Sequence, residues 1–444
     1  MGAEAEETLA GWGRLPVPGR EVVSEDFESI TRGMTLSRGL GRSYGDSSLP
    51  PPGRTVVAGS RLADRLLAFD AETGVLRAEA GLSLGELSRV FLPRGWSPPV
   101  FTGTQYVTLG GMAAADVHGK NHHRDGSFGD HVSRLRLRVA DGRVLWCSPD
   151  EHPDLFFATL GGMGLTGHML EVEVGLAKIP SPWILAESER IPDLDSFLDG
   201  LRRAASQWPF TVGWIDCLKT GRHMGRGLLN RGRWAEPGEA PPRPPPEKRR
   251  LTVPIDFPNW VLDRWSVRIF NASYYRKQLR RRVRRIMDPE AFFHPLDVLR
   301  DWNRIYGRRG FTQYQCVIPK AAGAEGVRRF FDLLTRLGAP SLLTVVKDLG
   351  EEGRGMLSFP MPGTTINLDL PVRADTQAAV DRLNDCVVDL GGRIYLAKDA
   401  FTRPEHFRAM EGPRLDGWLE VRRRWDPDGR LASAQSARIF GDLS

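Results

Sequence analysis

Long apolar runs are missing from this chain of 444 residues. None approaches the roughly 18 consecutive apolar residues that a membrane-spanning helix needs. Residues 1–7 include three glutamates, whereas a signal peptide begins with a basic and then an apolar segment. We therefore expect no transmembrane helix, no signal peptide and a cytoplasmic location, with peripheral contact at a membrane left open.

Cysteine is scarce as well. Only Cys147, Cys217, Cys316 and Cys386 occur, and they lie far apart without the spacing of a metal site. Isolated thiols of this kind are typical of a reducing compartment and of buried positions. The sequence thus predicts neither a disulfide framework nor a cysteine-based metal centre.

The rest of the composition is that of an ordinary globular protein, with 41% apolar and 26% charged residues. A chain of this length exceeds the usual size of one hydrophobic core, so we expect two domains. The net charge of +6 is modest, but basic residues concentrate in residues 274–287. The spacing of Leu279, Val283, Ile286 and Met287 predicts an amphipathic helix there. Its basic face either meets anionic lipid headgroups or is simply solvated. No nucleic-acid reading module surrounds it, so no nucleic-acid partner is predicted.

Residues 55–180 predict a mixed α+β arrangement. Strands are expected at 55–58, 66–69, 75–80, 132–139, 144–146 and 168–174, and helices at 83–91 and 153–160. Ser83 and Glu86 have the spacing of a capping box, and Asp141-Gly142 predicts a hairpin turn. Residues 162–167 formally match the dinucleotide fingerprint G-x-G-x-x-G. The expected order there is helix, turn, strand, the reverse of a Rossmann unit, so we reject an NAD fold.

Two glycine-rich stretches carry the strongest functional signal. In residues 38–46, three glycines let backbone N–H groups turn toward an anion, as in a pyrophosphate site. Residues 108–116 form a second small-residue run, and residues 115–123 follow with a dense set of polar side chains. His118, His122 and His123 suggest zinc binding as an alternative, because His118 and His122 have a spacing that suits a helix. Gly119 instead favours a loop at this position, so we predict no metal.

These stretches, with residues 126–129, 160–167, 311–319 and 393–399, resemble the decaprenylphosphoryl-β-D-ribose 2′-oxidase family of vanillyl-alcohol-oxidase type FAD enzymes. The resemblance runs from about residue 33 to residue 433. It implies an α+β, two-domain PCMH-type FAD-binding fold whose substrate domain is an antiparallel sheet covered by helices. The FAD-binding domain would comprise residues 1–178 and the substrate-binding domain residues 179–392. Residues 393–444 would complete the FAD domain. A proline-rich loop near residues 231–256 is expected to be disordered, or to be a lid that a ligand orders.

The resemblance also implies the site residues. FAD would contact Ser37, Arg38, Gly39, Leu40, Gly41, Arg42, Ser43, Tyr44, Gly45, Asp46, Ser47, Gly103, Thr108, Leu109, Gly110, Gly111, Ala115, Asp116, Val117, His118, Met169 and Tyr395. The catalytic candidates are Lys398, His118 and Tyr44, where Lys398 would either bind an anionic sugar phosphate or act as a base. The substrate would meet Lys120, Tyr306, Gln313, Gln315, Lys347, Thr365, Asn367 and Lys398.

Three positions depart from the patterns of the family or of the wider superfamily. Asn367 stands where the family has an active-site cysteine, and Thr365 stands where it has an asparagine. Arg42 replaces the histidine that tethers flavin in many enzymes of the wider superfamily, so we expect non-covalent FAD, with the Arg42 guanidinium free to face phosphate oxygens. An ordinary surface salt bridge is the alternative for Arg42.

The function that the resemblance implies is oxidation of a sugar hydroxyl to a ketone. The substrate would be the 2′-OH of a polyprenylphosphoryl ribose, in the first half of an epimerisation to the arabinose of cell-wall arabinan. A short-chain reductase would complete that epimerisation as a partner. The alternatives are an oxidase of another sugar or nucleoside-like alcohol, and a flavin-binding scaffold without turnover.

Overall fold

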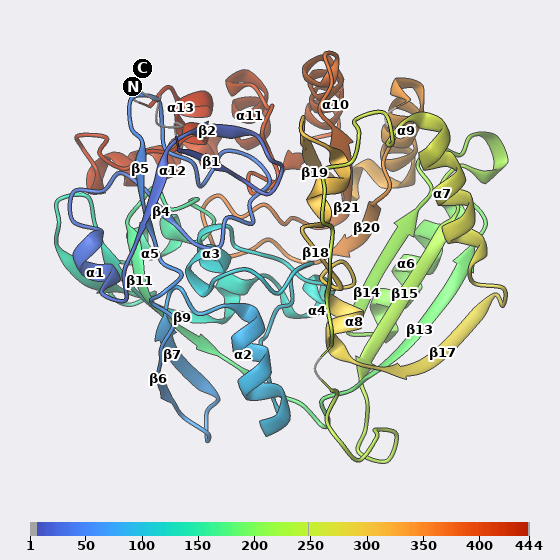
Figure 1. Ribbon diagram of the computed structural model, residues 1–444, viewed down its shortest axis with the longest axis horizontal. Coiled ribbons are helices and arrows are strands. Elements are labelled where there is room, and N and C mark those ends of the chain that lie inside the picture. The colour runs from blue at the N-terminus through green and yellow to red at the C-terminus, as the bar shows by residue number, and fades with distance from the viewer. Residues whose placement is uncertain (1–6, 247, 339, 443–444) are drawn as a thin grey trace.

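The computed structural model describes residues 7–246, 248–338 and 340–442. The acidic residues 1–6, on which the signal-peptide argument partly rests, lie outside the described residues, as does residue 247 of the proline-rich stretch. The described parts combine helices with largely antiparallel sheets (Figure 1), which confirms the α+β class. No helix within them is long and apolar enough to cross a bilayer.

The first half of the chain contains two larger sheets, seen in blue and teal in Figure 1, and two sheets of two strands each. The five-stranded antiparallel sheet has the order β10 (Val144–Cys147), β9 (Val132–Arg138), β11 (His168–Gly175), β7 (Val75–Glu79) and β6 (Leu66–Phe69). The three-stranded parallel sheet has the order β3 (Arg20–Val23), β5 (Val56–Gly59) and β4 (Ser37–Arg38). Shorter elements in this half are β1 (Thr8–Ala10), β2 (Pro16–Pro18), α1 (Phe27–Ile30), β8 (Trp96–Ser97), α4 (His122–Asp125) and β12 (Ala177–Lys178). The two-stranded sheets are β1–β2 and β12–β8.

Most local predictions for this half are confirmed. Helix α2 (Leu84–Phe91) begins where expected, with the Ser83 hydroxyl accepting a hydrogen bond from the Glu86 N–H. The predicted capping box is only half formed, because the Glu86 carboxylate accepts from Arg89 instead of from the Ser83 N–H. The turn between β9 and β10 places Gly142 at φ +93°, which favours glycine. The G-x-G-x-x-G segment lies between helix α5 (Pro153–Thr159) and strand β11, so it is not a Rossmann turn.

The second half is built on one antiparallel sheet of eight strands (Figure 1). Their order is β17 (Arg282–Met287), β13 (Ile184–Ile191), β15 (Gly227–Trp234), β14 (Phe210–Ile215), β20 (Thr344–Leu349), β21 (Gly363–Pro371), β19 (Phe311–Pro319) and β22 (Arg393–Ile394). Helices α6 (Leu194–Gln207), α9 (Gly323–Leu337) and α10 (Thr376–Asp389) pack against it. At Gly213 of β14 a Cβ would lie 2.2 Å from the Phe197 ring of α6, so glycine allows this close packing.

The helix predicted for residues 274–287 is wrong. Helix α7 (Arg264–Arg276) ends within this segment, residues 277–281 form neither helix nor strand, and Arg282–Met287 form the edge strand β17. Val283 pairs with Ser188 and Ile286 with Leu185 of β13. Tertiary pairing therefore overrides a helical spacing that the apolar residues satisfied only by coincidence.

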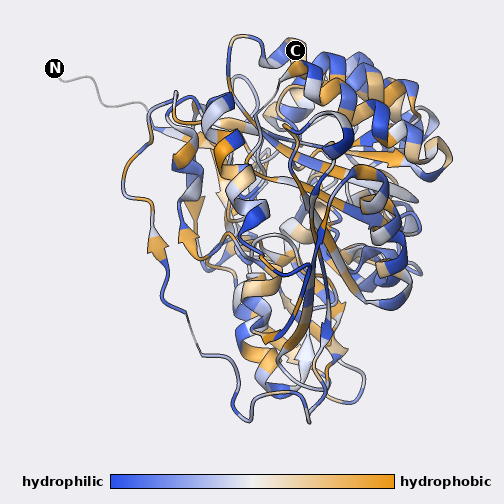
Figure 2. Ribbon diagram, turned by 90° about the vertical axis from the view of Figure 1, so that its right-hand side faces the viewer, coloured by the Kyte–Doolittle hydropathy of each residue, from blue (hydrophilic) through white to orange (hydrophobic). Residues whose placement is uncertain are grey.

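The proline-rich stretch forms a turn at residues 237–239, where the N–H groups of Glu239 and Ala240 donate to the Glu236 carbonyl oxygen. Strand β15 continues to Trp234, before this stretch. After it, β16 (Leu251–Thr252) pairs with β18 (Leu299–Arg300). Helix α8 (Pro289–Phe293) precedes β18 in the chain. Between β15 and β16 the described residues form neither helix nor strand, and Figure 2 shows them on the outside of the molecule. The Trp183 indole N–H donates to the Arg243 carbonyl oxygen at 2.9 Å. The stretch thus contacts the body of the protein.

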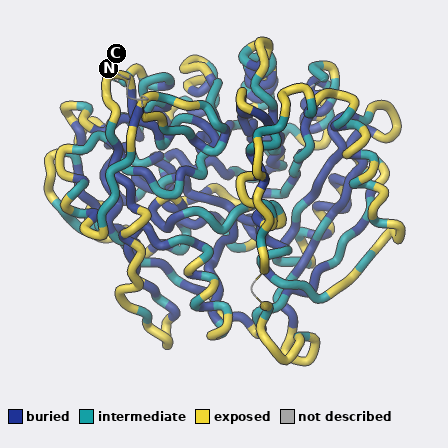
Figure 3. Tube along the Cα trace, viewed as in Figure 1, coloured by how far each residue is buried: buried dark blue, intermediate teal, exposed yellow. Residues whose placement is uncertain are grey.

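The C-terminal helices lie against the first half of the chain, where Figure 1 shows red helices beside blue strands. They are α11 (Pro404–Glu411), α12 (Pro413–Trp425) and α13 (Ala434–Phe440). Trp418 of α12 is fully buried, and its indole N–H donates to Ala158 of α5. Figure 3 shows that buried chain runs through the sheets, while exposed segments gather at the loops and outer helix ends.

Candidate active site

A cavity of about 850 Å³ lies between the glycine-rich loops of the first half and the eight-stranded sheet. Loop residues such as Gly41 and His118 line one side, and Gln313, Gln315 and Lys347 line the other. Lys398 reaches it from the segment after β22. Three regions that are distant in sequence therefore meet at one site.

The first glycine loop presents free backbone donors to this cavity. Within the described chain, the N–H groups of residues 39–43 donate no hydrogen bond to another residue. Gly41 has φ +63°, a conformation that favours glycine and turns the backbone. Successive unpaired N–H groups form an anion-binding concavity, so the loop has the chemistry of a phosphate cradle.

Arg42 adds a cation to this cradle. Its guanidinium stacks 3.8 Å from the centroid of the Trp12 ring, and no partner for its buried Nε occurs among the described residues. Burial lowers its pKa, and Asp297 partly opposes that effect. The alternative for Arg42, a surface salt bridge, is not found in the described structure. The N–H donors of its guanidinium are therefore available to a ligand in the cavity.

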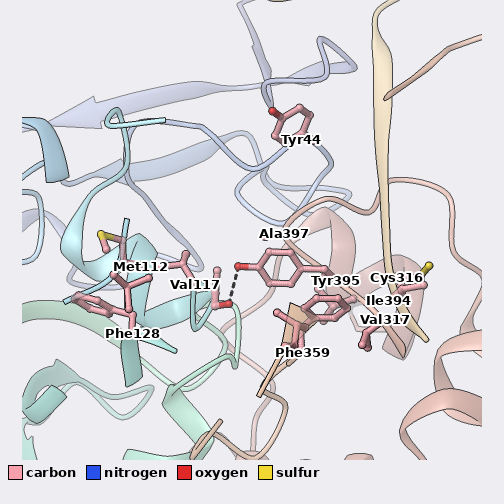
Figure 4. Close-up of a cluster of buried hydrophobic side chains, with 14 of the residues drawn as sticks. Tyr44, Met112, Val117, Phe128, Cys316, Val317, Phe359, Ile394, Tyr395 and Ala397 are labelled. Atoms are coloured by element: carbon pink, nitrogen blue, oxygen red, sulfur yellow. Dashed lines mark hydrogen bonds between the residues drawn. The ribbon is translucent and has the colours of Figure 1, made fainter. Parts of the chain in front are cut away.

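The second loop is held in place by two devices. The Thr108 hydroxyl accepts from the Gly111 N–H and caps helix α3 (Leu109–Ala114). The Tyr395 hydroxyl donates to the Ala115 carbonyl oxygen at 2.9 Å, as the dashed line in Figure 4 shows. A Cβ at Gly103 would meet no atom within 4 Å, so the backbone there borders open space in the cavity.

Most of the predicted FAD contacts line the cavity. They are Ser37, Arg38, Gly39, Leu40, Gly41, Arg42, Ser43, Tyr44, Ser47, Gly103, Thr108, Gly110, Gly111, Ala115, Val117, His118, Met169 and Tyr395.

Four predicted contacts lie behind the cavity wall, where they hold the loops. Asp46 forms a two-pronged ion pair with Arg438 of α13. The buried Asp116 carboxylate accepts from the hydroxyls of Ser127 and Ser358 and from a backbone N–H. Leu109 is fully buried, and a Cβ at Gly45 would lie 1.7 Å from the Asp399 carbonyl oxygen.

His118 stands at the centre of the polar end of the cavity. Its Nε2 lies 2.9 Å from the Gln315 amide nitrogen, and its Nδ1 lies 3.2 Å from Lys347 Nζ. Burial, and then the neighbouring Lys347, hold the pKa of His118 well below its usual range. A neutral imidazole accepts at only one nitrogen. If the Gln315 amide donates to Nε2, the ring proton is on Nδ1 and Lys347 must be an uncharged amine that accepts it. If Lys347 donates to Nδ1, the ring proton is on Nε2 and Gln315 presents its amide oxygen.

Three lysines converge on this end. Burial lowers the pKa of Lys398 to about 7; Asp369 acts in the opposite direction and Lys347 in the same one. Burial and then Lys347 lower the pKa of Lys120 to about 7, and burial lowers that of Lys347 to about 8. Lys398 Nζ also lies 4.0 Å from the centroid of the Tyr44 ring. The site thus holds amines that can be neutral near physiological pH and that an anionic ligand would recharge.

Asp369 is a buried carboxylate next to the site that the sequence analysis did not name. Its fully buried carboxylate accepts from the Tyr306 hydroxyl at 2.8 Å and from the Gln313 amide at 2.5 Å. Burial raises its pKa to about 6. The sequence analysis predicted no strand here; in the structure Asp369 follows Asn367 by two residues on β21 (Gly363–Pro371), so both side chains share a face.

The predicted substrate residues also fall into two groups, those that line the cavity and those that lie behind its wall. Lys120, Gln313, Gln315, Lys347, Asn367 and Lys398 line the cavity. Tyr306 is set back behind Asp369, and the Thr365 hydroxyl accepts from Gln315 and donates to the Cys316 carbonyl oxygen. Lys120 donates to the Phe293 carbonyl oxygen at 2.8 Å.

Asn367 has a free acceptor in the cavity. Its side-chain oxygen is buried without a hydrogen-bond partner in the described parts of the chain. A buried unpaired acceptor is costly, and a ligand hydroxyl or amine at this position would satisfy it.

Reagents that need a pocket thiol are not expected to label this protein, because all four cysteines are buried and none lines the cavity. We expect a thiol alkylator to leave the native mass unchanged and to add one label to an Asn367→Cys variant. Intact-mass spectrometry measures this. Thr365→Cys is the control, because residue 365 lies behind the cavity wall. A stoichiometric pocket adduct on the wild-type protein would contradict the prediction.

The histidines that raised zinc binding point to different partners. His118 faces Lys347, the His122 Nδ1 accepts from the Gly350 N–H, and the His123 Nε2 lies 3.0 Å from the Trp208 carbonyl oxygen. The described residues contain no group of three or more His, Cys, Asp or Glu side chains placed to hold a metal ion.

Comparison with known proteins gives consistent matches. Residues 33–148 match the model of the FAD binding domain family. The decaprenylphosphoryl-β-D-ribose oxidase of Mycolicibacterium smegmatis is 35% identical over 453 residues, covering 97% of each chain. An uncharacterised Streptomyces coelicolor protein is 34% identical over 376 residues, 81% of this chain and all of that one. A putative D-arabinono-1,4-lactone oxidase of Neurospora crassa is 30% identical over 109 residues, 24% of this chain and 19% of its own.

The residues around the glycine loops fit FAD. The unpaired N–H groups of residues 39–43 and the Arg42 guanidinium suit a pyrophosphate. Open space at Gly103 and the small residues Gly110, Gly111 and Ala115 allow the backbone to approach a flat ring.

Proposed function

Because the chain belongs to the decaprenylphosphoryl-β-D-ribose oxidase family, we propose that this FAD-dependent oxidoreductase converts the 2′-OH of a polyprenylphosphoryl ribose to a ketone. The observation that carries the proposal is the meeting of the FAD loops with Lys398, Lys347 and the neutral His118 in one cavity. This oxidation would be the first half of an epimerisation to arabinose.

Bound FAD supplies the acceptor for the hydride that leaves the sugar carbon. The chain's own residues would position the sugar and manage its proton. Lys398, with a pKa of about 7, is partly an uncharged amine at neutral pH and can take the hydroxyl proton. Lys120 and Lys347 offer the cations that a phosphodiester needs, since an anion stabilises their charged forms.

The test is anaerobic reduction of the bound flavin. Adding a polyprenylphosphoryl ribose to the purified yellow protein should bleach the visible flavin absorbance, whereas free ribose and nucleosides should not. Bleaching by a free sugar or nucleoside alone would overturn the assigned substrate. The same preparation tests our proposal that FAD is non-covalent, because denaturation should then release all of the flavin from the protein.

Asn367 favours one alternative, oxidation of a different sugar or nucleoside-like alcohol. An amide offers a hydrogen-bond acceptor and donors where the family has a thiol, so it selects for an additional polar group on the substrate. A panel of lipid-linked pentoses that differ at one hydroxyl distinguishes the two readings. A non-catalytic scaffold would bind FAD but show no bleaching with any of them.

Asp369 should set the pH at which Lys398 becomes a base. Its negative charge raises the pKa of Lys398, so removing that charge lowers this pKa below about 7. We expect the rising limb of flavin reduction rate against pH to move to lower pH in Asp369→Asn. Stopped-flow reduction across neutral pH measures this, with Asp301→Asn as a control at a surface position. An unshifted limb would show that Lys398 is not the titrating base.

We further propose a peripheral membrane contact, together with a short-chain reductase that takes the ketone product. Most exposed large apolar side chains in the described chain lie between residues 251 and 279: Leu251, Ile255, Trp260, Trp265, Ile269, Phe270 and Leu279. Residues 251–287 also carry nine basic residues against the acidic Asp256 and Asp263. Exposed tryptophan beside arginine suits the surface of an anionic bilayer.

Vesicle binding should depend on α7. The Trp265→Ala, Ile269→Ala double variant is expected to lower binding to phosphatidylglycerol vesicles by about tenfold, because two exposed apolar anchors are lost. Leu66→Ala, Leu67→Ala removes two exposed leucines elsewhere and should leave binding unchanged. Co-sedimentation measures both. Equal binding by the two double variants would argue against α7 as the contact.

A further inference from the structure

The cavity continues beyond its polar end along the eight-stranded sheet. Trp214, Val345, Asn367 and Gln315 are cross-strand neighbours on β14, β20, β21 and β19. Residues that pair directly in antiparallel strands point to the same face. One row of side chains therefore leads from the amides beside His118 to an aromatic and an aliphatic residue.

The outer part of this face carries apolar side chains on β14, β15 and β20, while the polar Asn230 and Ser188 continue the row from Val212 across β15 and β13. We call Val212, Trp214, Leu228, Leu343 and Val345 the apolar strip; all of them line the cavity. The polar atom of Trp214 is already satisfied, since its indole N–H donates to the Leu342 carbonyl oxygen at 3.1 Å. The strip thus presents hydrocarbon to the cavity, and covering it with an apolar ligand is favourable.

The far end of the strip is bordered by the end of α7 and by β17. Tyr274 packs on Trp214 with ring centroids 4.6 Å apart. Lys277, Val283 and Arg285 line the cavity at the same end. Leu279, in the turn between α7 and β17, is 86% exposed. The strip therefore connects the reactive end of the cavity with the exposed apolar segment around α7, on the right of Figure 1.

We propose that the apolar strip binds the isoprenoid units next to the phosphate of the substrate, and that the chain leaves between α7 and β17. This inference rests on the proposed function and extends it from the sugar to the lipid carrier. The polar groups at the inner end suffice for a sugar phosphate, so they leave the strip without a partner. An isoprenoid chain covers it without needing any hydrogen bond.

Filling the strip should block the chain but not the phosphate. Val212 is half-buried and lies on the strip, away from the three lysines, so Val212→Trp places an indole in the path of the chain. Isothermal titration of the FAD-loaded protein with farnesyl phosphate is expected to show at least a tenfold loss of affinity. Inorganic phosphate should bind as it does to the wild type. Val298→Trp, at an exposed valine, is the matched control and should change neither affinity.

A second variant covers the case in which the indole prevents folding. Val212→Asn keeps the size but makes the strip polar, and a severalfold weaker farnesyl phosphate affinity is expected. Farnesyl phosphate affinity that is unchanged in a folded Val212 variant overturns the proposal.

The sugar reaction separates this inference from the proposed function. Val212→Trp should lower the rate of flavin reduction by farnesylphosphoryl ribose and leave that by methylphosphoryl ribose unchanged. Equal losses for both sugars overturn the inference. Loss of farnesyl phosphate binding in Val212→Trp, without reduction by either sugar even in the wild type, supports the strip while refuting the oxidation.

Discussion

Replacing Lys398 with methionine is expected to lower the rate of flavin reduction by about a thousandfold, the usual contribution of a positioned base. Lys398 lines the cavity with a pKa of about 7, beside Asp369 and over the Tyr44 ring. Methionine has a similar length and no proton-accepting group, so packing against Tyr44 is largely kept. Single-turnover reduction under anaerobic conditions measures the rate.

Lys398→Arg separates the two roles of this residue. Arginine keeps the positive charge but stays protonated at neutral pH, so it can bind an anion and cannot act as a base. We expect Lys398→Arg to be nearly as slow as Lys398→Met. A substrate affinity and rate close to those of the wild type in Lys398→Arg would instead assign Lys398 to phosphate binding.

Gly45→Ala is expected to lower the free energy of unfolding by about 3 kcal/mol, the upper end of overpacking effects, and to release FAD. A Cβ at Gly45 would lie 1.7 Å from the Asp399 carbonyl oxygen, a backbone atom that cannot rotate away. The same contact joins the first glycine loop to the segment that carries Lys398. Thermal unfolding and the visible flavin absorbance of the purified protein measure the two effects.

Gly238 provides the matched control, because a Cβ there would meet no atom within 4 Å. Gly238→Ala should keep the melting temperature and the flavin content of the wild type. If Gly45→Ala retains both as well, the first loop does not need its close contact with Asp399.

Local elements of the first half were predictable because their signals are local. The Ser83 cap, the Asp141-Gly142 turn and the alternation along β11 each depend on residues a few positions apart. The basic segment 274–287 failed for the opposite reason. Its apolar spacing fits a helix, but pairing with β13, nearly a hundred residues earlier in the chain, makes its second half a strand.

The glycine pattern and the motif around Lys398 identified the family and thereby predicted a set of site residues, most of which line the cavity. They did not separate the residues that face the cavity from those behind it. Asp46, Asp116 and Tyr306 carry the same polar chemistry as their neighbours, yet they bind Arg438, Ser127 and Asp369 instead. Side-chain direction depends on which segments pack together, and a motif does not record that.

By itself, the sequence determined the α+β class, the flavin chemistry of the two glycine loops and the absence of a thiol at Asn367, since residue type and local spacing suffice for these. Only the tertiary structure decided that Asp369 lies beside Lys398, that three lysines share one cavity and that an apolar strip continues it. Burial and convergence shift the pKa of Lys398 to about 7, and both arise from strands far apart in the chain.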